Sequence, residues 1–155
     1  MNYVRFLHDI KNKRYTNKDK IDVFISIFRT EYFDKIDTYL SFLSERNQEL
    51  IRLLYVENTG KKQVAIDLNV EDYKIDLELS SILKKVYKYM LNDTHAYITN
   101  TTAISELDLP LNIYMRLLSV ADCVEEVVAL LNKGKIQGLG VGHRKNVYKI
   151  LEKRL

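Results

Sequence analysis

The residues best suited to chemistry lie near the C-terminus, in the segment IQGLGVGHRKNVYKIL at 136–151. Gly138 and Gly140 permit a tight turn whose backbone amides point outward as the next helix begins, an arrangement that binds anions such as phosphate. The cations that follow are Arg144, Lys145 and Lys149. The segment therefore predicts a helix-hairpin-helix that holds the phosphate backbone of DNA and carries little sequence information. The alternative is a glycine-rich connection that only ends one helix and begins the next.

Other kinds of chemistry have weaker support in the sequence. His8, His95 and His143 lie far apart and show no spacing typical of metal ligands. The single cysteine, Cys123, excludes an internal disulfide and a cysteine-based zinc site. No GxSxG nucleophile motif is present, and no strand precedes the glycines as a dinucleotide-binding motif requires. We therefore expect a protein that is not an enzyme and has no metal site and no cofactor.

The charged residues are distributed unevenly along the chain. The 155 residues, 46% hydrophobic and 29% charged, are typical of a folded protein, and the net charge is +3. Residues 1–20 carry six basic and two acidic side chains, or +4; residues 21–130 carry eleven and eighteen, or −7; residues 133–155 carry seven and one, or +6. Basic ends around an acidic middle indicate that only part of the molecule meets a polyanion.

The sequence gives no indication of a membrane segment. No apolar run approaches the roughly 18 residues that a bilayer crossing needs. The N-terminal stretch contains charges within its apolar run and has no cleavage site of small residues, so it does not resemble a signal peptide. We expect a soluble, cytoplasmic protein with no membrane partner, and the sequence predicts no particular oligomeric state.

The elements that position these residues are predicted to be helices. The only proline is Pro110, four of the five glycines lie between 134 and 142, and Gly60 is the sole breaker before Pro110. A helical stripe with spacing i, i+3, i+4, i+7 is formed by Ile21, Phe24, Ile25 and Phe28. Ser44 is a natural N-cap for a helix that should end at 57–60. No strand-like alternation of useful length is present, so the sequence predicts an all-α fold.

A polar segment divides the chain into two predicted domains. Residues 92–103, NDTHAYITNTTA, are rich in Thr and Asn, show no helical stripe and predict a linker. The parts that it separates are a helical domain at 1–91 and a smaller domain at 104–155. Asp122 is predicted to cap a helix in the second domain.

The segment after Gly60 predicts a helix-turn-helix. Val64, Ala65 and Leu68 form one face of a short helix, and small Ala65 allows close approach of the next helix. Asn69 stands where a sharp turn needs a residue that tolerates left-handed backbone angles. The apolar face of the longer second helix is formed by Ile75, Leu79, Ile82, Leu83 and Val86.

The stretch from Leu43 to Leu91 resembles region 4 of bacterial sigma factors. The resemblance rests on Leu54-Tyr55, Val64-Ala65, Leu68-Asn69 and Ile82-Leu83-Lys84-Lys85-Val86. It implies that the longer helix is a recognition helix facing the DNA major groove. The candidate nucleic-acid contacts of this segment are Lys61, Lys62 and Lys74.

The start of this longer helix departs from the sigma-factor pattern. It contains four acidic residues and one cation, and DNA phosphates repel carboxylates. The acidic residues are Glu71, Asp72, Asp76 and Glu78, and the cation is Lys74. Two interpretations stay open: this helix contacts DNA, or it has a structural or protein-binding role.

The segment 104–155 resembles the C-terminal domain of the bacterial RNA polymerase alpha subunit over its whole length. The residues that carry the resemblance are Ile104 to Leu109, Tyr114, Leu117, Val124-Glu125-Glu126-Val127 and Leu139-Gly140. Asn112 stands where the family has an arginine for the minor groove, and Arg116 is on the same helix face. Gly142 and His143 replace a lysine and a serine of the family's hairpin. The implied nucleic-acid contacts are Asn112, Arg116, Gly138, Gly140, Gly142, His143, Arg144, Lys145 and Lys149.

These features together predict a bacterial transcription regulator. An N-terminal helical module with a helix-turn-helix at about 43–91 would be followed by a helix-hairpin-helix module like the polymerase alpha C-terminal domain. The partners implied are DNA, bound mainly through its backbone, and RNA polymerase or a sigma factor. The alternative is a protein-interaction module that binds or mimics polymerase or sigma surfaces without touching DNA.

Overall fold

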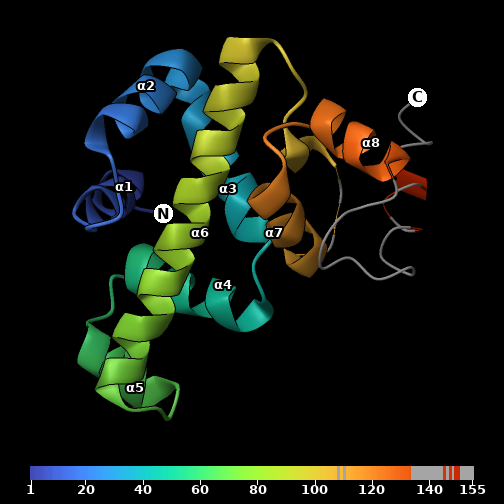
Figure 1. The fold of residues 1–155 in the computed structure, drawn as a ribbon. Coiled ribbons are helices and arrows are strands. Elements are labelled where there is room, and N and C mark those ends of the chain that lie inside the picture. The colour runs from blue at the N-terminus through green and yellow to red at the C-terminus, as the bar shows by residue number, and fades with distance from the viewer. Residues whose placement is uncertain (108, 110, 134–144, 146, 148, 151–155) are drawn as a thin grey trace. The chain divides into compact units, whose positions relative to one another are not determined.

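The computed structural model describes residues 1–107, 109, 111–133, 145, 147, 149 and 150. All regular structure in this part of the chain is helical, which confirms the predicted all-α class (Figure 1). The chain divides into two compact units, residues 1–88 (unit 1) and residues 89–155 (unit 2). Among the described residues, none of the helices combines the length and the apolar character that a bilayer crossing demands.

Unit 1 is built from short helices around an apolar core. Its elements in chain order are α1 (Tyr3–Lys11), α2 (Lys18–Phe28), the 3-10 turn η1 (Arg29–Glu31), α3 (Tyr32–Ser41), α4 (Glu45–Ile51), the π-helical turn η2 (Arg52–Val56), α5 (Lys61–Asp67) and the first part of α6 (Asp72–Thr99). Buried side chains from these elements include Phe6, Ile10, Ile21, Phe24, Ile36, Leu50, Ile75 and Ile82. Of the predicted stripe on α2, Ile21 and Phe24 are buried, whereas Ile25 and Phe28 are half-buried.

Short polar residues set the ends of these helices. Asn2 and Asn17 cap α1 and α2 with their side-chain oxygens. Ser44 is the N-cap of α4, as predicted, and its hydroxyl oxygen accepts a hydrogen bond from a backbone amide three residues later at 3.2 Å. The chain after η2 turns at Asn58, which has a left-handed φ of 55°. The helical stretch therefore ends within 57–60, as predicted from the sequence.

The segment 92–103, predicted as a non-helical linker, is helical as far as Thr99. This part of the prediction was wrong because α6 incorporates the polar residues that suggested a linker. Thr94 and Thr99 donate their hydroxyl groups to carbonyl oxygens four residues earlier in the helix, each at 2.8 Å. The non-helical connection is confined to 100–103, where Asn100 takes a φ of 52°.

Unit 2 contains the last part of α6, the 3-10 turn η3 (Ile104–Glu106), α7 (Leu111–Val120) and α8 (Val124–Asn132). The side chains buried in it include Tyr89, Ile104, Leu117, Val127 and Val147. Tyr89 packs edge-on against Tyr114, with 4.7 Å between ring centroids. An apolar core of this kind is consistent with a small helical unit.

A buried polar network joins three parts of unit 2. The side-chain nitrogen of Asn92 donates to the carbonyl of Asp122 at 2.7 Å, and its oxygen accepts from the amide of Ile104 at 3.2 Å. The hydroxyl of Ser105 donates to the carboxylate of Asp93 at 2.6 Å. Because Asn92 and Asp93 are buried, these bonds replace the hydrogen bonds to water that the groups give up on folding.

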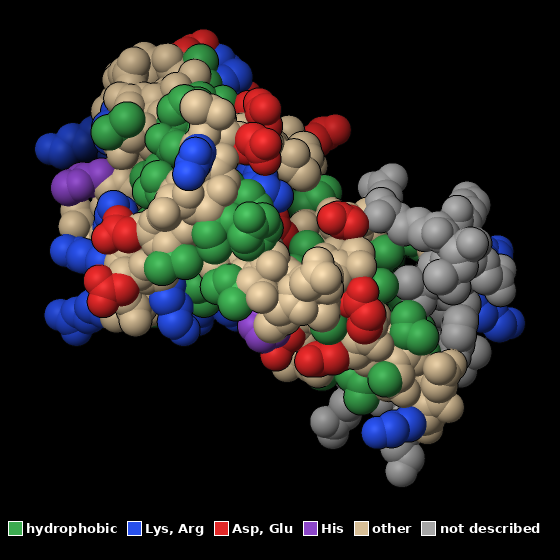
Figure 2. Space-filling view, turned by 90° about the horizontal axis from the view of Figure 1, so that it is seen from above, with side chains coloured by type: hydrophobic (Ala, Val, Ile, Leu, Met, Phe, Trp, Pro, Cys, Tyr) green, Lys and Arg blue, Asp and Glu red, His purple; other side chains and the backbone are tan. Residues whose placement is uncertain are grey.

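The surface of the described residues mixes charged and apolar side chains. On the face shown in Figure 2, acidic and basic side chains lie near one another, and hydrophobic side chains are visible between them. The exposed apolar residues include Tyr97 and Ile98 near the end of α6. Scattered exposure of this kind is common on folded proteins.

Candidate functional site

The segment predicted as a helix-turn-helix consists of α5, a turn at 68–71 and the beginning of α6. Asn69 has a φ of 54°, the left-handed conformation predicted for this position. The amide of Val70 donates to the carbonyl of Ala65 at 2.9 Å and closes the turn. Ala65 and Ile75 are buried, so the small side chain lies on the inner side of α5. This geometry places α5 and the start of α6 as two helices joined by a tight turn.

Among the exposed side chains of residues 61–78, four are acidic, with Asp67 the first of them, and three are basic. Glu71, Asp72 and Asp76 are exposed at the start of α6. The predicted nucleic-acid contacts Lys61, Lys62 and Lys74 are exposed as well. Lys61 is paired with Asp76, with 2.7 Å between its Nζ and a carboxylate oxygen. One of the three cations is therefore already opposed by a carboxylate of the same segment.

Two large apolar side chains are exposed on the same face of α6. Tyr73 is 57% exposed and Leu77 is 65% exposed. They are four residues apart and so lie on one side of the helix. Asp72 and Asp76 directly precede them in the sequence. The start of α6 thus presents apolar groups beside carboxylates, a combination that suits a protein surface better than a phosphate backbone.

The predicted contacts in unit 2 are only partly within the described residues. Asn112 and Arg116 are exposed on α7, four residues apart and therefore on one face. Lys145 and Lys149 are exposed and helical, and Val147 between them is buried. The remaining predicted contacts, Gly138, Gly140, Gly142, His143 and Arg144, lie outside the described residues, as does Pro110.

The N-terminus of α8 is organised differently from the prediction. Cys123 rather than Asp122 is the N-cap, and the Glu126 carboxylate accepts a hydrogen bond from the Asp122 amide at 2.9 Å. The Glu125 carboxylate accepts from the amide and hydroxyl of Thr102, at distances from 2.7 to 3.1 Å. These hydrogen bonds lower the pKa of Glu125, and the bond from the Thr102 hydroxyl has the largest effect. The carboxylates of Glu125 and Glu126, and not that of Asp122, therefore bind the backbone amides at this end of α8.

His8, His95 and Cys123 do not form a centre in the described part of the chain. Within the described part of the chain, no group of three His, Cys, Asp or Glu side chains is arranged to hold a metal ion. His8 and His95 are exposed on helices, and the side chain of His8 contacts the amide of Asn12 at 3.0 Å. Cys123 is buried.

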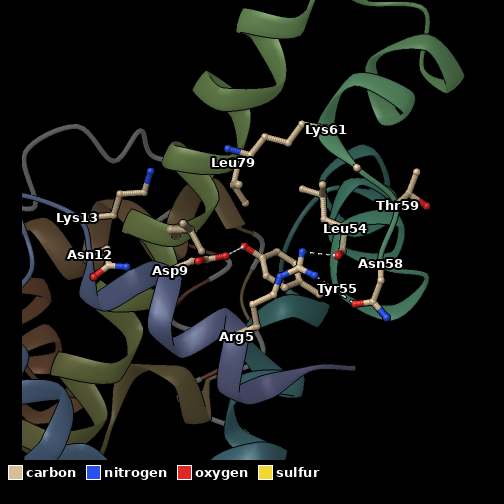
Figure 3. Close-up of a pocket in the computed structure, with 12 residues that line it drawn as sticks. Arg5, Asp9, Asn12, Lys13, Leu54, Tyr55, Asn58, Thr59, Lys61 and Leu79 are labelled. Atoms are coloured by element: carbon tan, nitrogen blue, oxygen red, sulfur yellow. Dashed lines mark hydrogen bonds between the residues drawn. The ribbon is translucent and has the colours of Figure 1, made fainter.

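Unit 1 contains a cleft that the sequence did not indicate (Figure 3). Its volume is about 450 Å³, and it is lined by α1 and the turn after it, by η2 and the loop that follows, by the start of α5 and by α6. Arg5 is fixed at its side: the guanidinium donates to the carbonyl of Leu54 at 2.6 Å and to the side-chain oxygen of Asn58 at 3.2 Å. The same guanidinium lies over the ring of Tyr55, 4.7 Å from its centroid.

These contacts make α1 the cap for the end of η2. The last carbonyl groups of a helix have no partner within it, and cations are favourable beside them. Here the amide of Asn2 donates to the carbonyl of Tyr55 at 2.9 Å, and Arg5 binds the carbonyl of Leu54. The Tyr55 hydroxyl donates to Asp9 at 2.6 Å. Burial, followed by this bond and the charge of Asp9, raises the pKa of Tyr55.

The cleft could not be found from sequence spacing because its residues are far apart in the chain. Arg5 and Asp9 come from α1, whereas Asn58 and Lys61 follow some fifty residues later. The one signal in the sequence is the excess of basic residues within 1–20, which indicates a charged N-terminal segment but not a cleft.

Comparison with protein-family models, with curated proteins and with solved structures finds no match for this chain. The functional proposal therefore depends on the geometry and charge of the chain itself.

Proposed function

We propose that this protein is a bacterial transcription regulator with two binding surfaces. The α5–turn–α6 segment would bind a protein of the transcription apparatus, with RNA polymerase or a sigma factor as the candidate. The basic C-terminal segment would bind the DNA backbone. Both the sigma-factor resemblance and the alpha-subunit resemblance are retained in this proposal. The acidic start of α6, however, is assigned to a protein partner and not to DNA.

The observation that carries the proposal is the α5–turn–α6 geometry. A short helix, a left-handed Asn69 and a buried Ala65 support a helix-turn-helix. The exposed carboxylates at the start of α6, next to Tyr73 and Leu77, support a basic protein surface as its partner. A DNA duplex would be repelled by the same carboxylates.

The DNA-binding part of the proposal is supported by charge. Residues 133–155 carry seven basic and one acidic side chain. Lys145 and Lys149, both helical, are exposed, while Val147 is buried. Cations held in this way bind phosphates and release counterions, so their affinity depends steeply on salt.

A fluorescence-anisotropy titration of duplex DNA at several salt concentrations tests the DNA-binding part. We expect Lys145→Glu with Lys149→Glu to weaken binding and to reduce the salt slope by about 0.9 for each phosphate that is no longer neutralised. The matched control is Lys18→Glu with Lys20→Glu, two exposed lysines of α2 with the same change in charge. An equal decrease in affinity in both variants would reject a specific role for the C-terminal segment.

The second candidate function, a protein-interaction module without DNA contact, is favoured by Tyr73 and Leu77. It predicts that Tyr73→Ser with Leu77→Ser abolishes binding to purified RNA polymerase. Val4→Ser, an exposed apolar residue of α1, is the control. If polymerase binding survives in the double variant, the α6 face is not the docking surface. Absence of salt-dependent DNA binding by the unmodified chain would favour this second function over the first.

A further inference from the structure

We propose that the cleft of unit 1 is a binding site for a small phosphate monoester with a body of about nucleoside size. Neither the C-terminal segment nor Tyr73 and Leu77 line the cleft, and Lys61 is the one predicted contact of the α5–turn–α6 segment that does. Its volume of about 450 Å³ falls within the range of small-ligand pockets, roughly 300–1,000 Å³.

Arg5 provides a preorganised cation at the cleft. Its guanidinium is held by the Leu54 carbonyl, the Asn58 side chain and the Tyr55 ring. These bonds use two of the five N–H donors that a guanidinium carries. No carboxylate among the described residues forms an ion pair with Arg5. A fixed cation that has free donors and forms no ion pair is suited to binding an anion.

Two lysines add positive charge from different elements. Lys13 follows α1, is half-buried and forms no ion pair with any carboxylate in the described part of the chain. Lys61 begins α5, and its side chain extends across the cleft toward Leu79 of α6 in Figure 3. Its pair with Asp76 is more than half exposed on both sides, so a ligand can replace that partner at small cost.

The balance of charge in the cleft favours an anion. Three cations and one carboxylate line it, and the carboxylate, Asp9, already accepts the hydrogen bond from Tyr55. Neutral polar groups come from Asn12, Asn58 and Thr59. A phosphate monoester, with up to two negative charges, would neutralise the excess of two positive charges.

The size of the cleft indicates what accompanies the phosphate. Leu54, Leu79 and Leu83 lie at the base of the cleft and are almost fully buried. The volume of about 450 Å³ is larger than a bare inorganic phosphate fills, which favours an organic ligand that carries the phosphate. The concave shape also favours a small molecule over the phosphates of a duplex, which lie on an extended convex surface.

Isothermal titration calorimetry of the full chain with adenosine monophosphate, inorganic phosphate and adenosine tests this site. We expect the nucleotide to bind more tightly than phosphate, and adenosine to show no measurable binding. Lys13→Gln and Lys61→Gln should each weaken nucleotide binding about tenfold, the usual effect of removing one charge-assisted hydrogen bond. Lys13→Arg should restore most of the affinity. The control Lys18→Gln removes an exposed lysine away from the cleft and should leave the affinity unchanged.

The proposal fails if adenosine binds as tightly as the nucleotide, or if neither glutamine variant changes the affinity. Duplex DNA provides the other source of phosphate and is titrated in parallel. If Lys13→Gln weakens duplex binding as much as nucleotide binding, the site belongs to nucleic acid and the small-molecule assignment is wrong. Because the DNA test above uses Lys145 and Lys149, the two proposals can fail independently.

Discussion

Asn92 shows how one buried side chain can join separate parts of a small helical unit. Its amide group bonds both the carbonyl of Asp122 and the amide of Ile104, so both ends of the side chain are satisfied. Removing it would take this partner from the buried amide of Ile104 and from the part-buried carbonyl of Asp122. An unsatisfied buried polar group costs about 1–3 kcal/mol.

Asn92→Ala is therefore expected to lower the free energy of opening of unit 2 by about 2 kcal/mol. Hydrogen exchange of the α7 amides measures this opening directly. The control His95→Ala changes an exposed residue of the same helix and should shift the value by less than about 0.5 kcal/mol. Equal exchange in the two variants would show that the network adds nothing to stability.

The pKa values of two tyrosine hydroxyl groups determine how the stability of the protein changes at alkaline pH. Burial raises the pKa of Tyr15 to about 12 from an ordinary value of 10.0. Burial and then the bond to Asp37 raise the pKa of Tyr3 to about 12. The folded state therefore favours the neutral phenol. Its contribution to stability is complete below pH 10 and is lost as the pH rises toward 12.

We expect the melting temperature to fall as the pH is raised from about 10 to about 12, with a smaller fall in Tyr15→Phe. Thermal melts at stepped pH and the ultraviolet absorbance of tyrosinate measure the two effects. Titration of all eleven tyrosines near pH 10 in the folded protein would contradict this prediction.

At the scale of elements, the turn between α5 and α6 depends on the backbone angles of one residue. A left-handed φ costs most residues about 1–2 kcal/mol, whereas Asn and Gly tolerate it. Asn69 has this conformation, and its neighbours close the turn by hydrogen bonds. The identity of this residue therefore determines how easily α6 can begin where it does.

Asn69→Val should lower the free energy of unfolding by about 1–2 kcal/mol, while Asn69→Gly should change it little. Urea denaturation measures both values. Lys62→Val, at an exposed helical position with ordinary angles, should cost only a few tenths of a kcal/mol. If both valine variants lose the same stability, β-branching rather than the left-handed φ is responsible.

The sequence predicts helix ends and turns well where the responsible side chain acts on backbone groups only a few residues away. Ser44 as a cap and Asn69 as a turn are of this kind, since each acts on backbone groups within one turn. The expectation that residues 92–99 lie outside a helix was wrong because polarity alone does not distinguish a solvated residue from a buried and bonded one. The partners of Asn92 lie 12 and 30 residues away, and no short-range pattern indicates them.

At the scale of the whole molecule, charge is divided between an acidic middle and a basic C-terminal segment. The balance is −7 over residues 21–130, from eleven basic and eighteen acidic residues, and +6 over 133–155. This division was visible in the sequence. The cleft was not, because only folding brings Arg5, Lys13 and Lys61 together.

Because charge is divided in this way, we expect substitutions in the acidic part to affect polymerase binding and substitutions in the basic part to affect duplex binding. Glu71→Gln with Asp72→Asn should weaken binding to RNA polymerase severalfold at low salt, since two exposed carboxylates are neutralised. The same change should affect duplex binding less than Lys145→Glu with Lys149→Glu. Surface plasmon resonance with polymerase and anisotropy with duplex measure the pair of effects. A larger change in duplex than in polymerase affinity would assign the acidic helix to DNA.

The position of the single cysteine has a practical consequence. Cys123 is buried at the beginning of α8, so a thiol-reactive reagent can reach it only when that region opens. The unmodified chain thus contains its own reporter, and the rate of alkylation measures the opening of unit 2 without any engineered label.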